Sequence, residues 1–215
     1  MVEIDYRFVN GLSFIRIEEQ DKPSETAPGT LGCRSGAFSG RYKNRNPDFL
    51  GIILCRKYED GFDYNYYKAI LTHEIGHHVT LGLINAKKYQ EISNLWENSS
   101  WANSWLKAHN ISDIEYAAVG FTMYQLGGEL FRTLSEYYEG DAAFYDWLKT
   151  NLFCDQEFPN QLCSWQVIMG DELLWHNQCA RALSAYYNAL TNFPGDTECE
   201  ITAQAGIASA KDRCP

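Results

Sequence analysis

The segment His73-Glu74-Ile75-Gly76-His77 constrains the fold of this chain more than any other feature. It has the pattern H-E-x-x-H. In an α-helix the two histidines of this pattern lie one turn apart on the same face. Two imidazoles in that arrangement suit one Zn²⁺ ion, and Glu74 beside them is a candidate general base. The apolar spacing around the motif predicts a helix from about Tyr64 to Leu83.

Histidine is concentrated in this one segment. The chain has 5 histidines, and His73, His77 and His78 are three of them. A single helical histidine is more often a packed core residue than a ligand. Three histidines clustered around a glutamate in an apolar helix favour a metal site instead. His78 would face another side of the helix, which indicates a packing or surface role.

A catalytic zinc ion takes three protein ligands and one water molecule, so a third ligand is needed. Thr80 and Leu83 stand where the extended metzincin pattern requires glycine and histidine, which excludes that pattern. The best candidate is Glu136, because a second helix packed against the first could bring its carboxylate to the metal. The alternative is that Glu136 is an exposed helix acid.

The H-E-x-x-H motif followed by Glu136-Tyr137-Tyr138 resembles the gluzincin metallopeptidases. Within them it is most similar to the group of anthrax lethal factor and Pro-Pro endopeptidase. The resemblance implies that Glu136 is the third zinc ligand beside His73 and His77. It also implies a zinc endopeptidase that hydrolyses peptide bonds through a metal-activated water, with Glu74 as the base.

The chain departs from that group at two places. The group has a second acid one turn after the ligand glutamate. Here that place holds Gly140, flanked by Glu139 and Asp141, and Asp141 is the preferred substitute. The group also has a tyrosine seven residues before the ligand, where this chain has Glu129. The oxyanion-stabilising donor is therefore open among four residues, of which His176 matches the downstream histidine of thermolysin-like gluzincins: His176, Tyr124, Tyr137 and Tyr138.

Strand signals come first along the chain and helical signals follow. Strands are predicted at Val2–Phe8, Ser13–Glu18 and Phe49–Cys55, and the last could offer an edge to an extended peptide. Helical periodicity runs through 86–109, through 113–150 with breaks near Gly127-Gly128 and Gly140, and through 164–190. This order predicts an α+β class.

The expected architecture is one zincin-like metallopeptidase domain over 1–215. A short N-terminal β-sheet would lie in a strand-rich part, 1–61. A mainly helical part, 62–195, would carry the zinc site. A polar, cysteine-containing tail would occupy 196–215.

The 7 cysteines favour disulfides and secretion. Five follow residue 150, and none forms the C-x-x-C pair of a zinc ribbon or thioredoxin-like centre. Candidate pairs are Cys33–Cys55, Cys154–Cys163 and Cys179–Cys199, although spacing alone does not fix the connectivity. Met1–Tyr6 has no signal-peptide character. The alternative is a set of reduced, buried thiols in a cytosolic protein.

A formal net charge of −10 excludes a nucleic-acid partner, because a phosphate backbone would be repelled. No apolar run reaches the length of a membrane span. The expected partner is a protein or peptide substrate, and the expected state is a monomer. Two other functions stay open. One is a catalytically silent zincin-fold binding module, and the other is an effector or toxin protease that acts inside a host cell.

Overall fold

The computed structural model divides into two compact units. The first comprises Met1–Glu97 and Trp105–Thr122, and the second comprises Asn98–Ser104 and Met123–Pro215. The expectation of a single domain over the whole chain stays a prediction. The structure describes residues 6–9, 14–19, 37–41, 50–56, 64–80, 84–99, 113–138 and 140–214.

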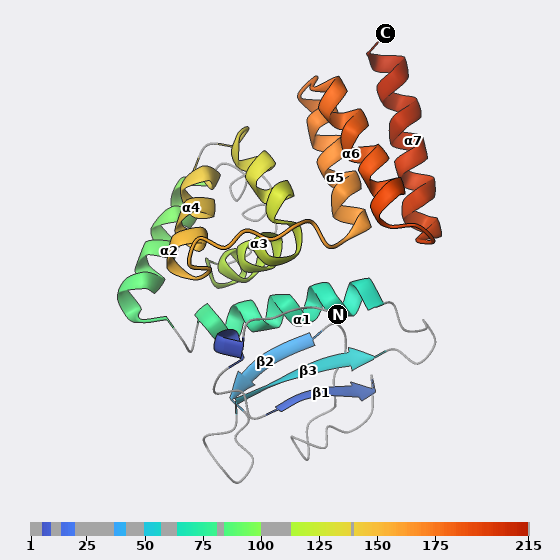
Figure 1. The fold of residues 1–215 in the computed structure, drawn as a ribbon. Helices are drawn as coiled ribbons and strands as arrows, with labels where there is room; N and C mark the ends of the chain where they lie inside the picture. The colour runs from blue at the N-terminus through green and yellow to red at the C-terminus, as the bar shows by residue number, and fades with distance from the viewer. Residues whose placement is uncertain are drawn as a thin grey trace. The chain divides into compact units, whose positions relative to one another are not determined.

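The first unit contains a small sheet covered by a helix. Strands β1 (Phe14–Glu19), β2 (Ala37–Arg41) and β3 (Leu50–Arg56) pair in the order β1-β3-β2. Strand β3 runs parallel to β1 and antiparallel to β2. Helix α1 (Tyr64–His78) packs against β2 and β3 (Figure 1). Because β3 has a neighbour on each side, it is not the free edge that the sequence suggested for peptide pairing.

Two further helices of this unit pack through aromatic side chains. They are α2 (Ala86–Asn98) and the first half of α3 (Asp113–Ser135). The rings of Trp96 and Tyr116 lie 5.1 Å apart between their centroids. Phe8, in the short 3₁₀ helix η1 (Tyr6–Phe8), meets Phe121 edge to face at 5.1 Å. These contacts hold α3 in a fixed position within the unit, because Tyr116 and Phe121 are both buried.

The second unit is helical wherever the structure describes regular secondary structure in it. It contains the rest of α3, then α4 (Asp141–Asn151), α5 (Cys163–Trp175), α6 (Cys179–Asn192) and α7 (Thr197–Arg213). Helix α3 kinks at Gly127, where φ is −131° and ψ is 19°. The Trp165 ring occupies the space that a side chain at Gly127 would need.

Helices α5, α6 and α7 lie side by side as a bundle (Figure 1). Tyr186 of α6 is fully buried, and its ring lies against Gly170 of α5 and Gly206 of α7. Two disulfides fasten the same three helices. Cys163–Cys199 joins the start of α5 to α7, and Cys179–Cys214 joins the start of α6 to the C-cap of α7. None of the described helices is long and apolar enough to cross a membrane.

The α+β class expected from the sequence is wrong, because the residues that the structure describes are mainly helical. Part of the predicted strand Val2–Phe8 is the 3₁₀ helix Tyr6–Phe8. The predicted polar tail is the long helix α7. Its buried positions include Ala203 and Ala210, small residues that favour a helix without marking an obvious apolar stripe.

Two local predictions in the second unit are also wrong. The single helix expected over 164–190 is two helices, α5 and α6, and Asn177 between them has a φ of 58° that an α-helix does not allow. The pairs Cys154–Cys163 and Cys179–Cys199 do not form, because α7 brings Cys199 to Cys163. In the predicted Cys33–Cys55 pair, Cys33 lies outside the described residues, so this pair stays a prediction.

Candidate metal centre

Two histidines and one glutamate converge in the first unit. The His73 Nε2 atom lies 3.1 Å from Oε2 of Glu115, and the His77 Nε2 atom lies 3.3 Å from Oε1 of the same carboxylate. The three ligand atoms all lie within 4.8 Å of one another. Both imidazoles therefore point their Nε2 atoms at the carboxylate of Glu115.

The two helices that carry these residues explain the arrangement. Helix α1 places His73 and His77 one turn apart, with ring centroids 4.6 Å apart and ring planes at 85°. Glu115 comes from the first turn of α3. The side chain of His77 is 10% exposed, whereas that of Glu115 is 44% exposed. The cluster of His73, His77 and Glu115 is therefore buried at His77 and reaches solvent at Glu115. A site that admits water or substrate needs such an open side.

The three side chains are close enough to share one metal ion. The His73 and His77 Nε2 atoms contact different oxygens of Glu115, at 3.1 Å and 3.3 Å, and one ligand atom from each residue lies within 4.8 Å of the other two. Two imidazoles and a carboxylate are also a donor set found in catalytic zinc sites, where the fourth position is left for water. The residues present therefore fit the ion that the motif implies.

Electrostatics favour a cation here. Hydrogen bonds from the His73 and His77 rings hold the pKa of Glu115 well below its usual range, against the opposing effect of partial burial. The carboxylate is thus ionised at neutral pH. The Nδ1 atom of His77 is buried and has no hydrogen-bond partner among the described residues. A metal ion would replace the Nε2 protons that donate to Glu115, and the His77 ring would then carry its proton on Nδ1 and offer the Nε2 lone pair to the ion.

Glu74, the predicted base, lies between the two motif histidines in the sequence of α1 and is 6% exposed. Acidic side chains are rarely this buried in proteins. His78 is 4% exposed, which agrees with a packing role for this third histidine.

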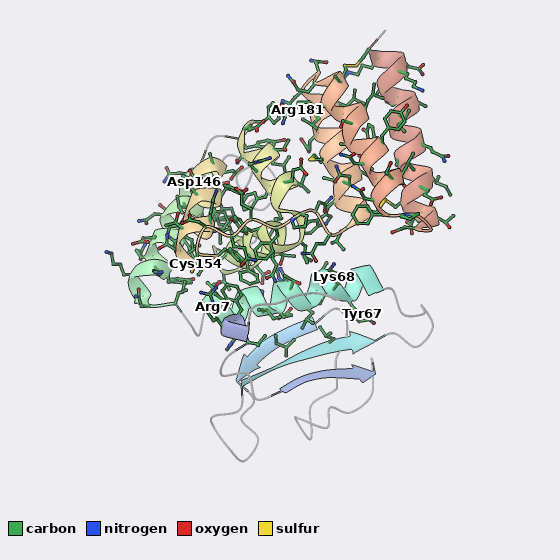
Figure 2. The ribbon with its side chains drawn as sticks, in the orientation of Figure 1. Arg7, Tyr67, Lys68, Asp146, Cys154 and Arg181 are labelled. Carbon is green, nitrogen blue, oxygen red and sulfur yellow. A yellow bond between two sulfur atoms is a disulfide. The ribbon has the colours of Figure 1, made fainter. Side chains whose placement is uncertain are left out.

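Glu136, the predicted third ligand, belongs to the second unit and lies just after the end of α3. Its Oε2 atom accepts hydrogen bonds from both Nη1 and Nη2 of Arg181, each at 3.1 Å. Figure 2 labels Arg181 on α6. The metal-capable group that contains His73 and His77 has Glu115 as its acid. A metal-binding role for Glu136 stays a prediction.

His176 and the two tyrosines after Glu136 form an aromatic cluster in the second unit. The His176 ring stacks on Tyr137 with centroids 4.2 Å apart and planes at 10°. Tyr138 meets the same ring edge to face, and its hydroxyl donates to Glu172 at 2.9 Å. Burial and this hydrogen bond raise the pKa of Tyr138 to about 12. These contacts give His176 a packing role, while its predicted catalytic role is untested.

Other candidates from the sequence also have structural contacts. Tyr124 is fully buried, stacks on Phe153 and donates its hydroxyl to the Gln156 carbonyl at 2.9 Å. Asp141 is buried at the start of α4 and accepts a hydrogen bond from the Ser99 hydroxyl. Glu129 is exposed. Glu139 lies outside the described residues.

Glu115 is the site residue that sequence reasoning missed. The signal was present, since Glu115 precedes an aromatic residue, Tyr116, as Glu136 precedes Tyr137. Small residues follow it at Ala117 and Ala118, which permits close approach to another helix. Periodicity predicted the helix but did not show which of its acids faces α1.

A second group with metal-ligand spacing comprises Cys163, Asp196 and Cys199. Its two cysteines are joined as a disulfide. Asp196 caps α7 by accepting from the Cys199 backbone N–H at 3.1 Å. All three residues therefore have structural roles.

Comparisons with protein-family models, with curated proteins and with solved structures each found no match.

Proposed function

We propose that the chain is a zinc-dependent endopeptidase whose metal ligands are His73, His77 and Glu115. The observation that carries the proposal is the convergence of both motif histidines on one ionised carboxylate. We assign the ligand role to Glu115 rather than to Glu136, the acid predicted from the sequence, because Glu136 pairs with Arg181.

A zinc ion in this position supplies Lewis acidity that polarises a water molecule and a substrate carbonyl. Glu74 acts as the general base, taking a proton from the attacking water and passing it to the leaving amine. His73 and His77 bind as neutral donors and Glu115 as an anion. The ligand set then carries one negative charge against the two positive charges of the metal, so the centre keeps net positive charge.

The substrate class is a protein or peptide, and the exposure of Glu115 gives the site an open side toward solvent. We place the protein outside the cell, where disulfides persist. The two described disulfides, Cys163–Cys199 and Cys179–Cys214, support that location.

The test combines metal analysis with a cleavage assay. The purified chain is expected to contain one zinc per molecule and to cleave members of a peptide library, and a chelator should abolish cleavage. Glu74→Gln should keep the zinc and lose about 10²–10⁴-fold in rate, the usual contribution of a general base. Proteolysis retained in Glu74→Gln would overturn the mechanism. Bound zinc without cleavage of any peptide would instead favour the silent binding module.

A further inference from the structure

Helices α1 and α3 come unusually close at Gly76, inside the H-E-x-x-H motif. A Cβ atom added at Gly76 would lie 2.9 Å from the Cα and 3.1 Å from the carbonyl oxygen of Ala118. It would also lie 3.1 Å from the Cβ of Phe121. The nearest obstacle is helix backbone, which cannot rotate aside as the end of a side chain can. Only glycine fits this contact without moving α3.

Glycine inside a helix has a cost of about 1 kcal/mol relative to alanine, so its presence needs a reason. The metal ligands provide one. Gly76 adjoins His77 and lies about one turn from His73, and Ala118 lies about one turn from Glu115 in α3. The distance between the helices at Gly76 and Ala118 therefore also sets the distance from the carboxylate to both rings.

Two threonines keep this contact free of unsatisfied polar groups. The buried Thr80 hydroxyl donates to the Gly76 carbonyl at 2.7 Å. The buried Thr122 hydroxyl donates to the Ala118 carbonyl at 2.8 Å. Each threonine thus bonds to a carbonyl four residues earlier in its own segment, so neither hydroxyl is left unpaired beside the contact of Gly76 with Ala118.

We propose that Gly76 is a positioning residue that sets the spacing between Glu115 and the two histidines; this inference rests on the proposed metal site. Ordinary van der Waals contact begins near 3.4 Å, so a methyl group at Gly76 displaces α3 by about half an ångström. Zinc sites hold their ligand distances within about 0.2 Å. The displacement therefore exceeds what the site tolerates.

A purely structural role for Gly76 predicts a different result, and a double-mutant cycle separates the two. Zinc affinity is measured by competition with a chelating dye for the wild type, Gly76→Ala, Glu115→Gln and the double variant. If Gly76 acts by placing Glu115, Gly76→Ala should weaken zinc binding about 10–100-fold in the wild type, the range seen for residues that orient ligands. It should have less than about a threefold effect once Glu115 is replaced.

Co²⁺ absorption supplies a second measurement, because its visible bands report ligand number and symmetry. Gly76→Ala should lose intensity in these bands, as Glu115→Gln does. Ala118→Ser is a milder change at the same contact and serves if Gly76→Ala fails to fold. Gly206→Ala is the matched control, since the same added methyl group meets the Tyr186 ring in the other unit. It should leave zinc affinity and the Co²⁺ spectrum unchanged.

Equal losses from Gly76→Ala with and without Glu115 would overturn the inference while leaving the metal site intact. Unchanged affinity in Gly76→Ala would do the same. A wild-type chain that binds no zinc would instead overturn the proposed function, and the inference with it.

Discussion

Arg181 holds Glu136 through two guanidinium nitrogens, Nη1 and Nη2, each 3.1 Å from the same carboxylate oxygen. Arg181 also donates to the Tyr137 hydroxyl at 3.1 Å. The acid that the sequence favoured as a ligand therefore has a structural partner within its own unit. Glu115 has the two motif histidines as its partners. Because Glu115 and Glu136 have different partners, substituting each of them should show which one binds the metal.

Glu115→Gln should lower zinc affinity by about 100-fold or more, because even residues that only orient a ligand contribute 10–100-fold. Glu136→Gln should leave the affinity unchanged within about threefold. Both changes remove one negative charge and keep the side-chain shape, so each serves as the control for the other. Zinc competition titration measures both. A larger loss in Glu136→Gln than in Glu115→Gln would restore Glu136 as the ligand.

Zinc should stabilise the first unit selectively, because His73, His77 and Glu115 all belong to it. Free zinc at about 100 times its dissociation constant adds about 2.7 kcal/mol to the stability of the state that binds it. Hydrogen exchange should slow in α1 and in residues 113–122 on adding zinc. Exchange in α5, α6 and α7 should not change. Uniform slowing throughout the chain would contradict the local site.

Gly206→Ala should destabilise the second unit by about 1–3 kcal/mol, the usual cost of inserting a methyl group into a packed core. The added methyl group would meet the Tyr186 ring, which is fully buried. Denaturant unfolding followed by the exchange of α6 and α7 amides measures the loss. Ala208→Gly, two residues further along α7 at an exposed position, is the control for helix propensity alone.

The protein should lose stability as pH rises from about 10 to about 12. Burial and a 2.9 Å hydrogen bond to Glu157 raise the pKa of Tyr145 to about 12. The unfolded chain has an ordinary tyrosine pKa of about 10 and so loses this proton first. The stabilisation is complete below pH 10 and disappears as pH passes the folded value. Tyr145→Phe should show a shallower fall of unfolding free energy over this range, and an unchanged slope would contradict the assignment.

Replacing both Cys179 and Cys214 by serine should destabilise the helical bundle by up to about 4 kcal/mol, the loop-closure value for a bridge of this span. The bridged residues are 35 positions apart in sequence. Cys154→Ser, an exposed position outside the two described disulfides, is the control and should change stability by less than about 0.5 kcal/mol. Denaturant unfolding under oxidising conditions measures both variants. Equal stabilities for the two would show that the bridge does not constrain the fold.

The helix that carries the H-E-x-x-H motif was predicted well because its apolar spacing is local. Helical geometry alone places His73 and His77 one turn apart, and α1 begins at the predicted Tyr64 and ends at His78 rather than at Leu83. The break at Gly127 was also visible, since glycine marks helix irregularities. These features depend on neighbours in the chain.

The partner of the two motif histidines and the disulfides depend instead on tertiary packing. Glu115 and Glu136 each precede an aromatic residue in the sequence, and only the contacts of Glu115 with His73 and His77 show that it faces α1. Cys199 pairs with Cys163 because the chain after Asp196 forms a helix, which its small, polar composition concealed. The fold class was wrong partly because this helical segment was predicted to be a polar tail.

The two described sulfur bridges lie in one unit, and the three candidate metal donors lie in the other. With zinc bound as we propose, a reductant and a chelator are expected to act on separate parts of the polypeptide, so that electron supply and metal supply would each affect one unit.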